Sequence, residues 1–309
     1  MECLKGSGRA WATEKLQRVG GAREAVLRVT LLGTGNPRPL LERFGPSILV
    51  EMDQERLLFD VGRGATQRMF EKGVSLAVVS EVFLTHLHSD HVVGLPDLWL
   101  TGWIFQRTRA LHVRGPPGTR EMVGHLSRAY AFDVHARRDL DEHLPAEGAE
   151  IQGEDLVPGV VHRGDSMIVT AFEVDHGPVK PAFGYRIEGG GRSVVLSGDT
   201  RPSENLMRHA QGTDLLIHEV AAATEEHIRG SPIALQVLAH HTSPEAAGEV
   251  FTRVAPRLAV YSHIVLLGGL TEEDLLTRTR RTYAGPLAVG QDGMVLSVGD
   301  TVTVELPSR

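Results

Sequence analysis

The segment THLHSDH, Thr85–His91, gathers three histidines and an aspartate directly after the apolar run EVFLT. On an extended chain the side chains of His86 and His88 point the same way because they are two residues apart. Asp90 and His91 follow where the chain turns, so they can face a second point. Imidazole and carboxylate are ligands of zinc, iron and manganese. We interpret the segment as a cradle for two adjacent metal ions, the alternative being a histidine-rich loop with Asp90 as a helix N-cap.

Short apolar strands that end on polar residues must position these side chains. RLLFD, EVFLT, SVVLSGD, DLLIHE and LAVYSH follow this pattern. Because they are apolar throughout, they predict central strands covered on both faces. Ligands of open α/β sheets bind beyond the carboxyl ends of such strands, so we expect the chemistry at one edge. The polar residues at these ends are Asp60, His86, His88, Asp90, His91, Asp199, His218, Glu219 and His263.

The chain has 309 residues, enough for one large α/β domain or two small ones. Residues 1–24 are polar without a clear period and predict an N-terminal tail. No composition break follows, so we predict a single domain over residues 25–309. The strand-rich segments 29–60 and 168–199 can pair as two layers. Residues 286–306 predict a β-hairpin with the QDG tripeptide as its turn.

Composition excludes several classes of site. The single cysteine, Cys3, permits neither an intrachain disulfide nor a thiolate zinc site. The net charge of −7 weighs against a generic nucleic-acid binder. The sequence has no signal-peptide core and no apolar run of about 20 residues, so we expect a cytoplasmic protein without a membrane partner. It has no G-x-S-x-G or phosphate-loop motif, and GTGNPR holds only two of the dinucleotide-binding glycines.

HLHSDH after a β-strand resembles the signature of the metallo-β-lactamase superfamily. The order of LGTG, LLFDVG, HLHSDH, AFGYRI, LSGDT, LIHE, HHTSPEAA and YSH, over roughly residues 28–300, resembles its ribonuclease Z-like branch. The resemblance implies an α/β fold, the αββα sandwich, with two divalent metal ions at the sheet edge and zinc as the expected metal. Its implied ligands are His86, His88 and His176 for the first ion, Asp90, His91 and His263 for the second, and Asp199 as the bridge.

The resemblance also implies catalytic roles. Asp90 is expected to hold a metal and orient the attacking hydroxide. Glu219 and His240 are expected to protonate the leaving group, although the adjacent His241 leaves the choice of histidine open. The alternative for Glu219 is a surface carboxylate or one that supports a ligand. In isolation His176 would be a strand-end histidine in a turn, but the complete ordered ligand set argues against that.

The chain departs from the ribonuclease Z pattern between His176 and Asp199. In bacterial enzymes that process transfer RNA this interval carries a protruding arm, whereas here it spans 23 positions. We therefore disfavour RNA as a partner and expect a dinuclear hydrolase of a small ester or phosphodiester. Trp99, Trp103 and Phe105 line a substrate pocket or form a helical core stripe.

Several alternatives to this reading stay open. One is a transfer-RNA 3′-end endoribonuclease, and another is a β-lactam hydrolase. A binding scaffold without activity is disfavoured because no ligand position is lost. An iron-dependent oxidoreductase and a homodimer also stay open.

Overall fold

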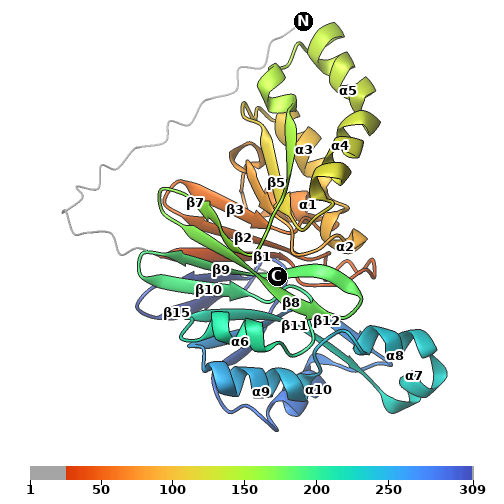
Figure 1. Cartoon of the computed structure of the whole chain (residues 1–309), viewed down its shortest axis with the longest axis vertical. Helices are drawn as coiled ribbons and strands as arrows, with labels where there is room; N and C mark the ends of the chain where they lie inside the picture. The colour runs from red at the N-terminus through yellow and green to blue at the C-terminus, as the bar shows by residue number, and fades with distance from the viewer. Residues whose placement is uncertain (1–25, 308–309) are drawn as a thin grey trace, which may run out of the picture.

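Two β-sheets face each other and carry helices on their outer sides (Figure 1). The computed structural model describes residues 26–307, so the tail predicted for residues 1–24 lies outside the described part. The layers confirm the predicted αββα sandwich and the pairing of the segments around 29–60 and 168–199. None of the helices within residues 26–307 is long and apolar enough to cross a bilayer.

The first sheet has eight strands in the order β15-β14-β1-β2-β3-β4-β5-β6. Pairing is parallel from β3 to β6 and antiparallel elsewhere. The carboxyl ends of β3 and β4 therefore lie at one edge. The strands are β1 (Leu27–Gly33), β2 (Ser47–Met52), β3 (Glu55–Phe59), β4 (Glu81–Phe83), β5 (Leu111–Gly115), β6 (Ile151–Asp155), β14 (Val295–Val298) and β15 (Val302–Glu305).

The second sheet has seven strands in the order β13-β12-β11-β10-β9-β8-β7. Pairing is parallel from β10 to β13 and antiparallel from β7 to β10. The strands are β7 (Gly159–Arg163), β8 (Ile168–His176), β9 (Val179–Gly189), β10 (Arg192–Leu196), β11 (Leu215–Ala223), β12 (Leu258–Leu267) and β13 (Leu287–Val289).

Helices cover both outer faces. Those between β3 and β6 lie over the first sheet, and α6, α9 and α10 lie under the second (Figure 1). The helices are α1 (Ala65–Glu71), α2 (Ser89–Val92), α3 (Leu95–Ile104), α4 (Thr119–Ala129), α5 (Ala131–His135), α6 (Glu204–Ala210), α7 (Glu225–Gly230), α8 (Pro232–Leu238), α9 (Pro244–Val254) and α10 (Glu272–Thr279), with short helical turns at Leu76–Val78, Ala136–Leu140 and Ala146–Ala149.

Three hydrophobic layers hold the sandwich together. One cluster lies between the sheets, and one lies between each sheet and its helices. Strand β10 contributes to two of them, because Val194 and Leu196 face the other sheet while Val195 faces the helices. Apolar strands buried on both faces are thus confirmed.

The two tryptophans of α3 belong to this core. Trp99 and Trp103 are buried, and their indole N–H groups donate to the carbonyl oxygens of Ala149 (3.0 Å) and Pro145 (2.8 Å). Phe105 is 64% exposed at the end of the helix. The core-stripe interpretation therefore holds for Trp99 and Trp103, and none of the three aromatic side chains lines the cavities beside the predicted metal ligands.

A buried arginine follows the same helix. The guanidinium of Arg107 donates to the carbonyl oxygens of Leu98 (3.2 Å), Trp99 (2.6 Å) and Gly148 (3.3 Å). Within residues 26–307 it has no carboxylate partner. Burial lowers the pKa of Arg107 to about 10, so the group stays charged at neutral pH. It joins the middle of α3 to the turn at Gly148 through carbonyl oxygens on both segments.

The sequence analysis predicted a hairpin with the QDG tripeptide as its turn, and this prediction is wrong, because the strands on either side of QDG do not pair with each other. Strand β13 pairs with β12 in the second sheet, whereas β14 pairs with β1 in the first, so the QDG tripeptide crosses between sheets. The carboxylate of Asp292 holds this crossing by accepting from the backbone of Thr34 (2.9 Å) and Phe44 (2.6 Å). The hairpin of this region is β14–β15. A turn signal marks a change of direction but does not say which sheet the next strand joins.

Candidate metal centre

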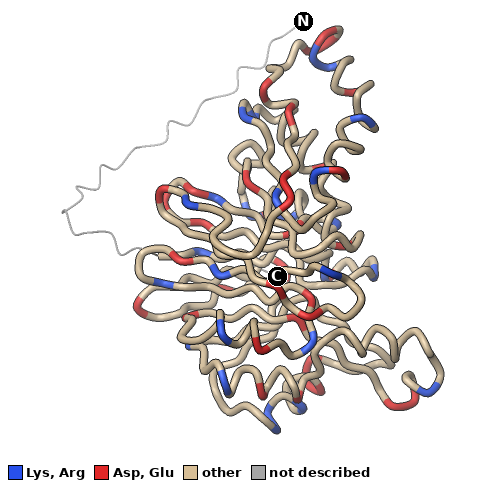
Figure 2. Tube along the Cα trace, in the orientation of Figure 1, with Lys and Arg blue, Asp and Glu red and all other residues tan. Residues whose placement is uncertain are grey.

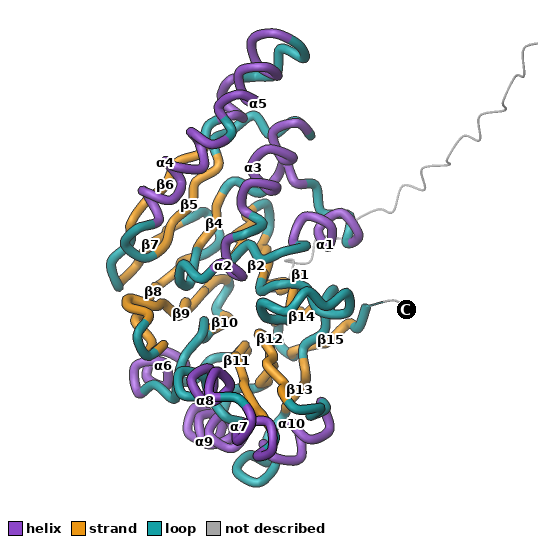
Figure 3. The backbone as a smooth tube through the Cα atoms, turned by 90° about the vertical axis from the view of Figure 1, so that its right-hand side faces the viewer, coloured by secondary structure: helices purple, strands orange, loops and turns teal. Residues whose placement is uncertain are grey.

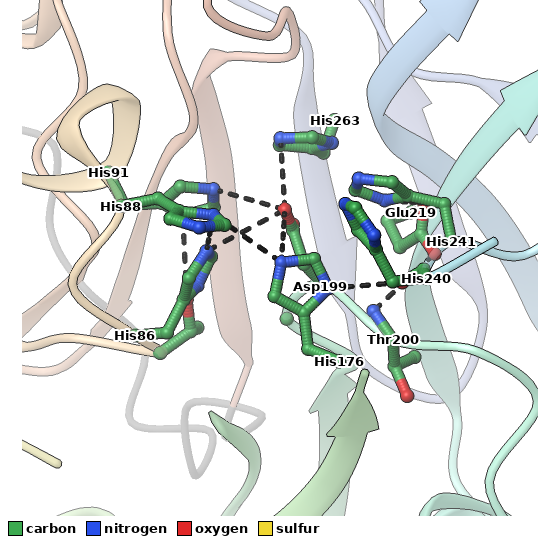
Figure 4. Close-up of polar contacts among 12 residues, drawn as sticks. His86, His88, His91, His176, Asp199, Thr200, Glu219, His240, His241 and His263 are labelled. Atoms are coloured by element: carbon green, nitrogen blue, oxygen red, sulfur yellow. Dashed lines mark hydrogen bonds and ion pairs between the residues drawn. The ribbon is translucent and has the colours of Figure 1, made fainter. Parts of the chain in front are cut away.

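All seven predicted ligands lie at one edge of the sandwich. Helix α2 of the first layer meets the second sheet there (Figure 3), and Figure 4 labels each of these ligands except Asp90. The first sheet provides the loop after β4 and helix α2. The second provides the end of β8, the loop after β10 and the middle of β12. The centre therefore joins both layers.

Strand β12 does not end at the predicted residue. It continues to Leu267, and His263 lies within it with φ +43°. The pairing of β12 with β11 shifts register at this level. Such irregularities redirect side chains near active sites, and this one turns His263 toward Asp199.

Three histidine nitrogens surround one point. Nδ1 of His88 lies 3.0 Å from Nε2 of His86 and 3.4 Å from Nε2 of His176. Oδ2 of Asp199 lies 3.8 Å from the first Nε2 and 3.9 Å from the second. Neutral imidazole nitrogens facing one another present lone pairs, which is the ligand set for a cation.

A second group of ligand atoms shares the same carboxylate. Oδ2 of Asp199 lies 3.2 Å from Nε2 of His263 and 3.5 Å from Nε2 of His91. Oδ2 of Asp90 lies 3.3 Å and 3.7 Å from the same two nitrogens. Among residues 26–307, Nε2 of His91 and Oδ1 of Asp199 are buried and have no hydrogen-bond partner. These free atoms fit a second cation, with Asp199 between the two positions.

The outer ring nitrogens fix the orientation of three of these histidines. Nδ1 of His86 faces the hydroxyl of Thr85 (3.1 Å), and Nδ1 of His176 faces the carbonyl oxygen of His240 (3.0 Å). Nδ1 of His91 faces the carboxylate of Asp60 (2.8 Å). Metal-binding histidines commonly donate their second nitrogen in this way.

Asp60 is a residue to which the sequence assigned no role. It lies after β3 with φ +56°, and its carboxylate also accepts from the backbone and the hydroxyl of Thr85, each at 2.8 Å. The only sequence feature that could have pointed to this supporting role was the position of Asp60 at the polar end of an apolar strand.

Burial and mutual charge shift the titration of the metal-free centre. Burial lowers the pKa of His86 well below its usual range and that of His176 to about 4. Burial alone would also lower the pKa of His91, but Asp199 and Asp60 raise it well above its usual range. Burial opposes ionisation of Asp199, yet His263 and His91 hold its pKa well below the usual value. The centre thus favours an ionised bridge and neutral first-site histidines, the forms that bind metal.

A carboxyl–imidazole pair lies beside this centre. The carboxylate of Glu219 accepts from the backbone N–H of Thr242 (2.7 Å) and faces Nδ1 of His241 (3.1 Å). The ring of His241 stacks on that of His263 with centroids 5.5 Å apart. Burial, with the charge of Asp199, raises the pKa of Glu219 well above its usual range.

His240 is placed differently from the expectation. Its ring lies edge-on to His176, with centroids 5.0 Å apart, and its backbone rather than its side chain orients that ligand. Of the two adjacent histidines, it is His241 that contacts Glu219, the other residue expected to protonate the leaving group. Both rings lie at the centre (Figure 4), and the assignment of the proton donor to His240 stays a prediction.

Residues 55–264 match the family model described as the beta-lactamase superfamily domain. Ribonuclease Z of Mycolicibacterium gilvum (strain PYR-GCK) is 37% identical over 273 residues, which cover 86% of this chain and 94% of that protein. The chain belongs to the metallo-β-lactamase superfamily, in its ribonuclease Z-like branch. It is accordingly a metal-dependent hydrolase.

Solved structures share the fold. The metallo-β-lactamase-fold protein YhfI from Bacillus subtilis has a TM-score of 0.70 at 18% identity, covering 88% of this chain and all of that one. Human tRNase Z, short form, has a TM-score of 0.64 at 21% identity, covering 87% of this chain and 98% of that one. At these identities the likeness concerns the fold alone.

Proposed function

We propose that this chain hydrolyses phosphodiester bonds at a dinuclear centre. His86, His88 and His176 would hold one ion. The second would be held by Asp90, His91 and His263, with Asp199 shared. Bound divalent ions would neutralise the charge of the attacked phosphate and supply a nucleophile near neutral pH. The nitrogen and oxygen ligands suit zinc.

The Glu219–His241 pair carries this proposal. Metal binding alone does not need it, yet a ring nitrogen of His241 lies within 4.8 Å of ligand atoms of Asp199 and His263. An imidazole in this position can donate a proton to the departing oxygen of the substrate. Glu219 would hold the ring in place and return the proton. Cleavage that releases an alkoxide needs such an acid.

The comparisons bear on the substrate. The relative from Mycolicibacterium gilvum is named ribonuclease Z, and the match covers 94% of that protein and 86% of this chain. The hairpin β9–β10 fills the interval between His176 and Asp199, which leaves no room for an arm. Because a relative named ribonuclease Z nevertheless matches this chain over most of its length, the missing arm is only a weak argument against an RNA substrate. We therefore place an RNA 3′ end first, which reverses the preference drawn from the sequence. A small phosphodiester is second, supported by the armless interval.

One substrate panel tests this proposal. The metal-loaded protein should be assayed with precursor transfer RNA, bis-p-nitrophenyl phosphate, p-nitrophenyl acetate and a chromogenic β-lactam. We expect cleavage of one or both phosphodiesters and little of the other two. The Asp90→Ala variant should lose at least a hundredfold, within the roughly 10²–10⁴ that positioned acid–base groups contribute. Efficient hydrolysis of the acetate or the β-lactam, with both phosphodiesters untouched, would reject it.

A further inference from the structure

A cavity of about 360 Å³ opens directly beside the metal centre. Its inner wall includes ligand residues of the centre, among them His88 and Asp199. A second wall is apolar and comes from helix α8 and the end of β12, through Ala234, Val237 and Val265. In Figure 3 helices α7 and α8 lie below α2 at this edge. The volume is at the lower end of the range for small-ligand sites, enough for a group of about one nucleotide.

Arg38 provides the cationic side of the cavity. It is the only lysine or arginine among the described residues that line it. Arg38 is exposed at the rim of the cavity, and across residues 26–307 its guanidinium has no hydrogen-bond or ion-pair partner, so it is free to meet a ligand. An unpaired guanidinium in a ligand cavity presents N–H donors in the geometry that phosphate oxygens accept.

The backbone at Arg38 is held in place. The side chain of Asn36 is buried and donates to the carbonyl oxygen of Ile264 at 2.6 Å, one residue beyond the predicted ligand His263. The carbonyl of the same side chain accepts from the backbone N–H of Arg38 at 3.1 Å. Pro37 between them restricts the loop further. The loop that carries the guanidinium is therefore fixed to the strand that carries the metal ligand.

We propose that Arg38 binds a second phosphate of the substrate, next to the phosphate attacked at the centre, while the apolar wall accommodates the intervening nucleoside. The proposal rests on the proposed phosphodiesterase function and names its substrate class as an oligonucleotide end. A diester with a single phosphate would leave Arg38 unused. The subsite also explains how a chain of net charge −7 attracts an anionic substrate locally.

Equilibrium binding tests the subsite independently of turnover. The metal-loaded protein should be titrated with adenosine 5′-monophosphate and with adenosine 3′,5′-bisphosphate by calorimetry. We expect the bisphosphate to bind roughly ten- to hundredfold more tightly, the equivalent of one charge-assisted hydrogen-bonded contact. Arg38→Met should remove this difference, and Arg38→Lys should keep part of it because a point charge lacks the planar fork.

The matched control is Arg229→Met. Arg229 lies on neighbouring α7, is 71% exposed, pairs with Glu225 and does not line the cavity. The Arg229→Met substitution removes the same positive charge and should leave the preference for the bisphosphate unchanged. Equal preference in the wild type and the Arg38→Met variant, or equal losses in both arginine variants, would overturn the subsite.

Hydrolysis of bis-p-nitrophenyl phosphate separates the two proposals. This diester has no second phosphate, so Arg38→Met should lower its kcat/KM by a smaller factor than it lowers the affinity for the bisphosphate. Failure of the wild type to cleave any phosphodiester would reject the proposed function, while the titrations would still decide on Arg38. A tenfold loss on this single-phosphate substrate would show that Arg38 acts at the centre instead, and would overturn the subsite.

Discussion

Asp60 accepts three hydrogen bonds on one carboxylate, two from Thr85 and one from His91. Through them it holds a ligand ring of the second site and the residue that precedes the HLHSDH motif. A residue of this kind affects metal binding without touching the metal.

Asp60→Asn should weaken metal binding by roughly ten- to hundredfold, because the amide replaces an acceptor by a donor facing Nδ1 of His91. Competition with a chelator of known affinity measures this loss. Asp97→Asn is the matched control, since Asp97 accepts from the hydroxyls of Thr66 and Thr101 on the helical layer. Unchanged metal affinity in Asp60→Asn would mean that His91 is oriented by other contacts.

His241→Ala should lower phosphodiester hydrolysis by roughly 10²–10⁴ with metal content retained, as expected for removal of an acid that acts in the transition state. His240→Ala should cost less than tenfold, because the carbonyl that orients His176 belongs to the backbone. Turnover and elemental analysis of both variants, side by side, decide between them. The reverse order would restore His240 as the donor.

The sequence could predict that the candidate ligands gather at one edge, because four of them lie in one contiguous motif, His176 ends β8 and Asp199 closely follows β10. His263 lies within β12 and was found only through the resemblance. The sequence could not say which of His240 and His241 faces Glu219. The two residues are adjacent, and only the conformation of the segment before α9 decides which ring points to that carboxylate. Asp60 ends a strand in the same manner as the ligands do, so its supporting role is visible only from its contacts.

At the scale of elements, the strands were predictable and their allocation to sheets was not. Continuous apolar runs indicate burial on both faces, and this held for β10. The crossing at Asp292 has the same turn composition as a hairpin, so only the partners of β13 and β14 distinguish them. Arg107 lies in the polar stretch QRTRA, where nothing marks it as buried.

Arg107→Met should lower the free energy of unfolding by about 3 kcal/mol, because the buried hydrogen bonds from a charged donor to the carbonyl oxygens of Leu98, Trp99 and Gly148 are lost and each such bond contributes about 1.5–3 kcal/mol. Urea denaturation with an unchanged m-value measures it. Arg109→Met is the control, since that side chain is exposed two residues along. A loss below about 1 kcal/mol would show that water or local shifts satisfy the carbonyls.

At the scale of the molecule, bound metals would link the two sheets, since four of the candidate ligands come from the first layer and three from the second. Charged residues of both signs are interspersed over both layers in the view of Figure 2. Long-range attraction between the layers is therefore not the expected source of their stability. Metals bound at the centre would add a direct cross-link.

Removal of the metals should lower the melting temperature by roughly 5–10 °C. Ions at 100 times their dissociation constant stabilise by about 2.7 kcal/mol, and each kcal/mol shifts Tm by roughly 2–4 °C in domains of 150–250 residues. Calorimetry before and after chelation, with zinc added back, measures this. The same chelator should hardly move Tm of Asp199→Asn, which lacks the shared carboxylate. Equal shifts in both proteins would place the stabilising metal elsewhere.

The pairing of β1 with β14 has a consequence for the order of assembly. Leu27 lies opposite Val298, so the first sheet joins segments from the two ends of the described chain. Bringing these segments together costs conformational entropy before the contacts between them form, and folds rich in such distant pairings therefore fold slowly. During synthesis β1 exposes an unpaired edge until β14 leaves the ribosome. The nascent protein therefore depends on protection of that edge, by chaperones or by its own early helices, against pairing with neighbouring chains.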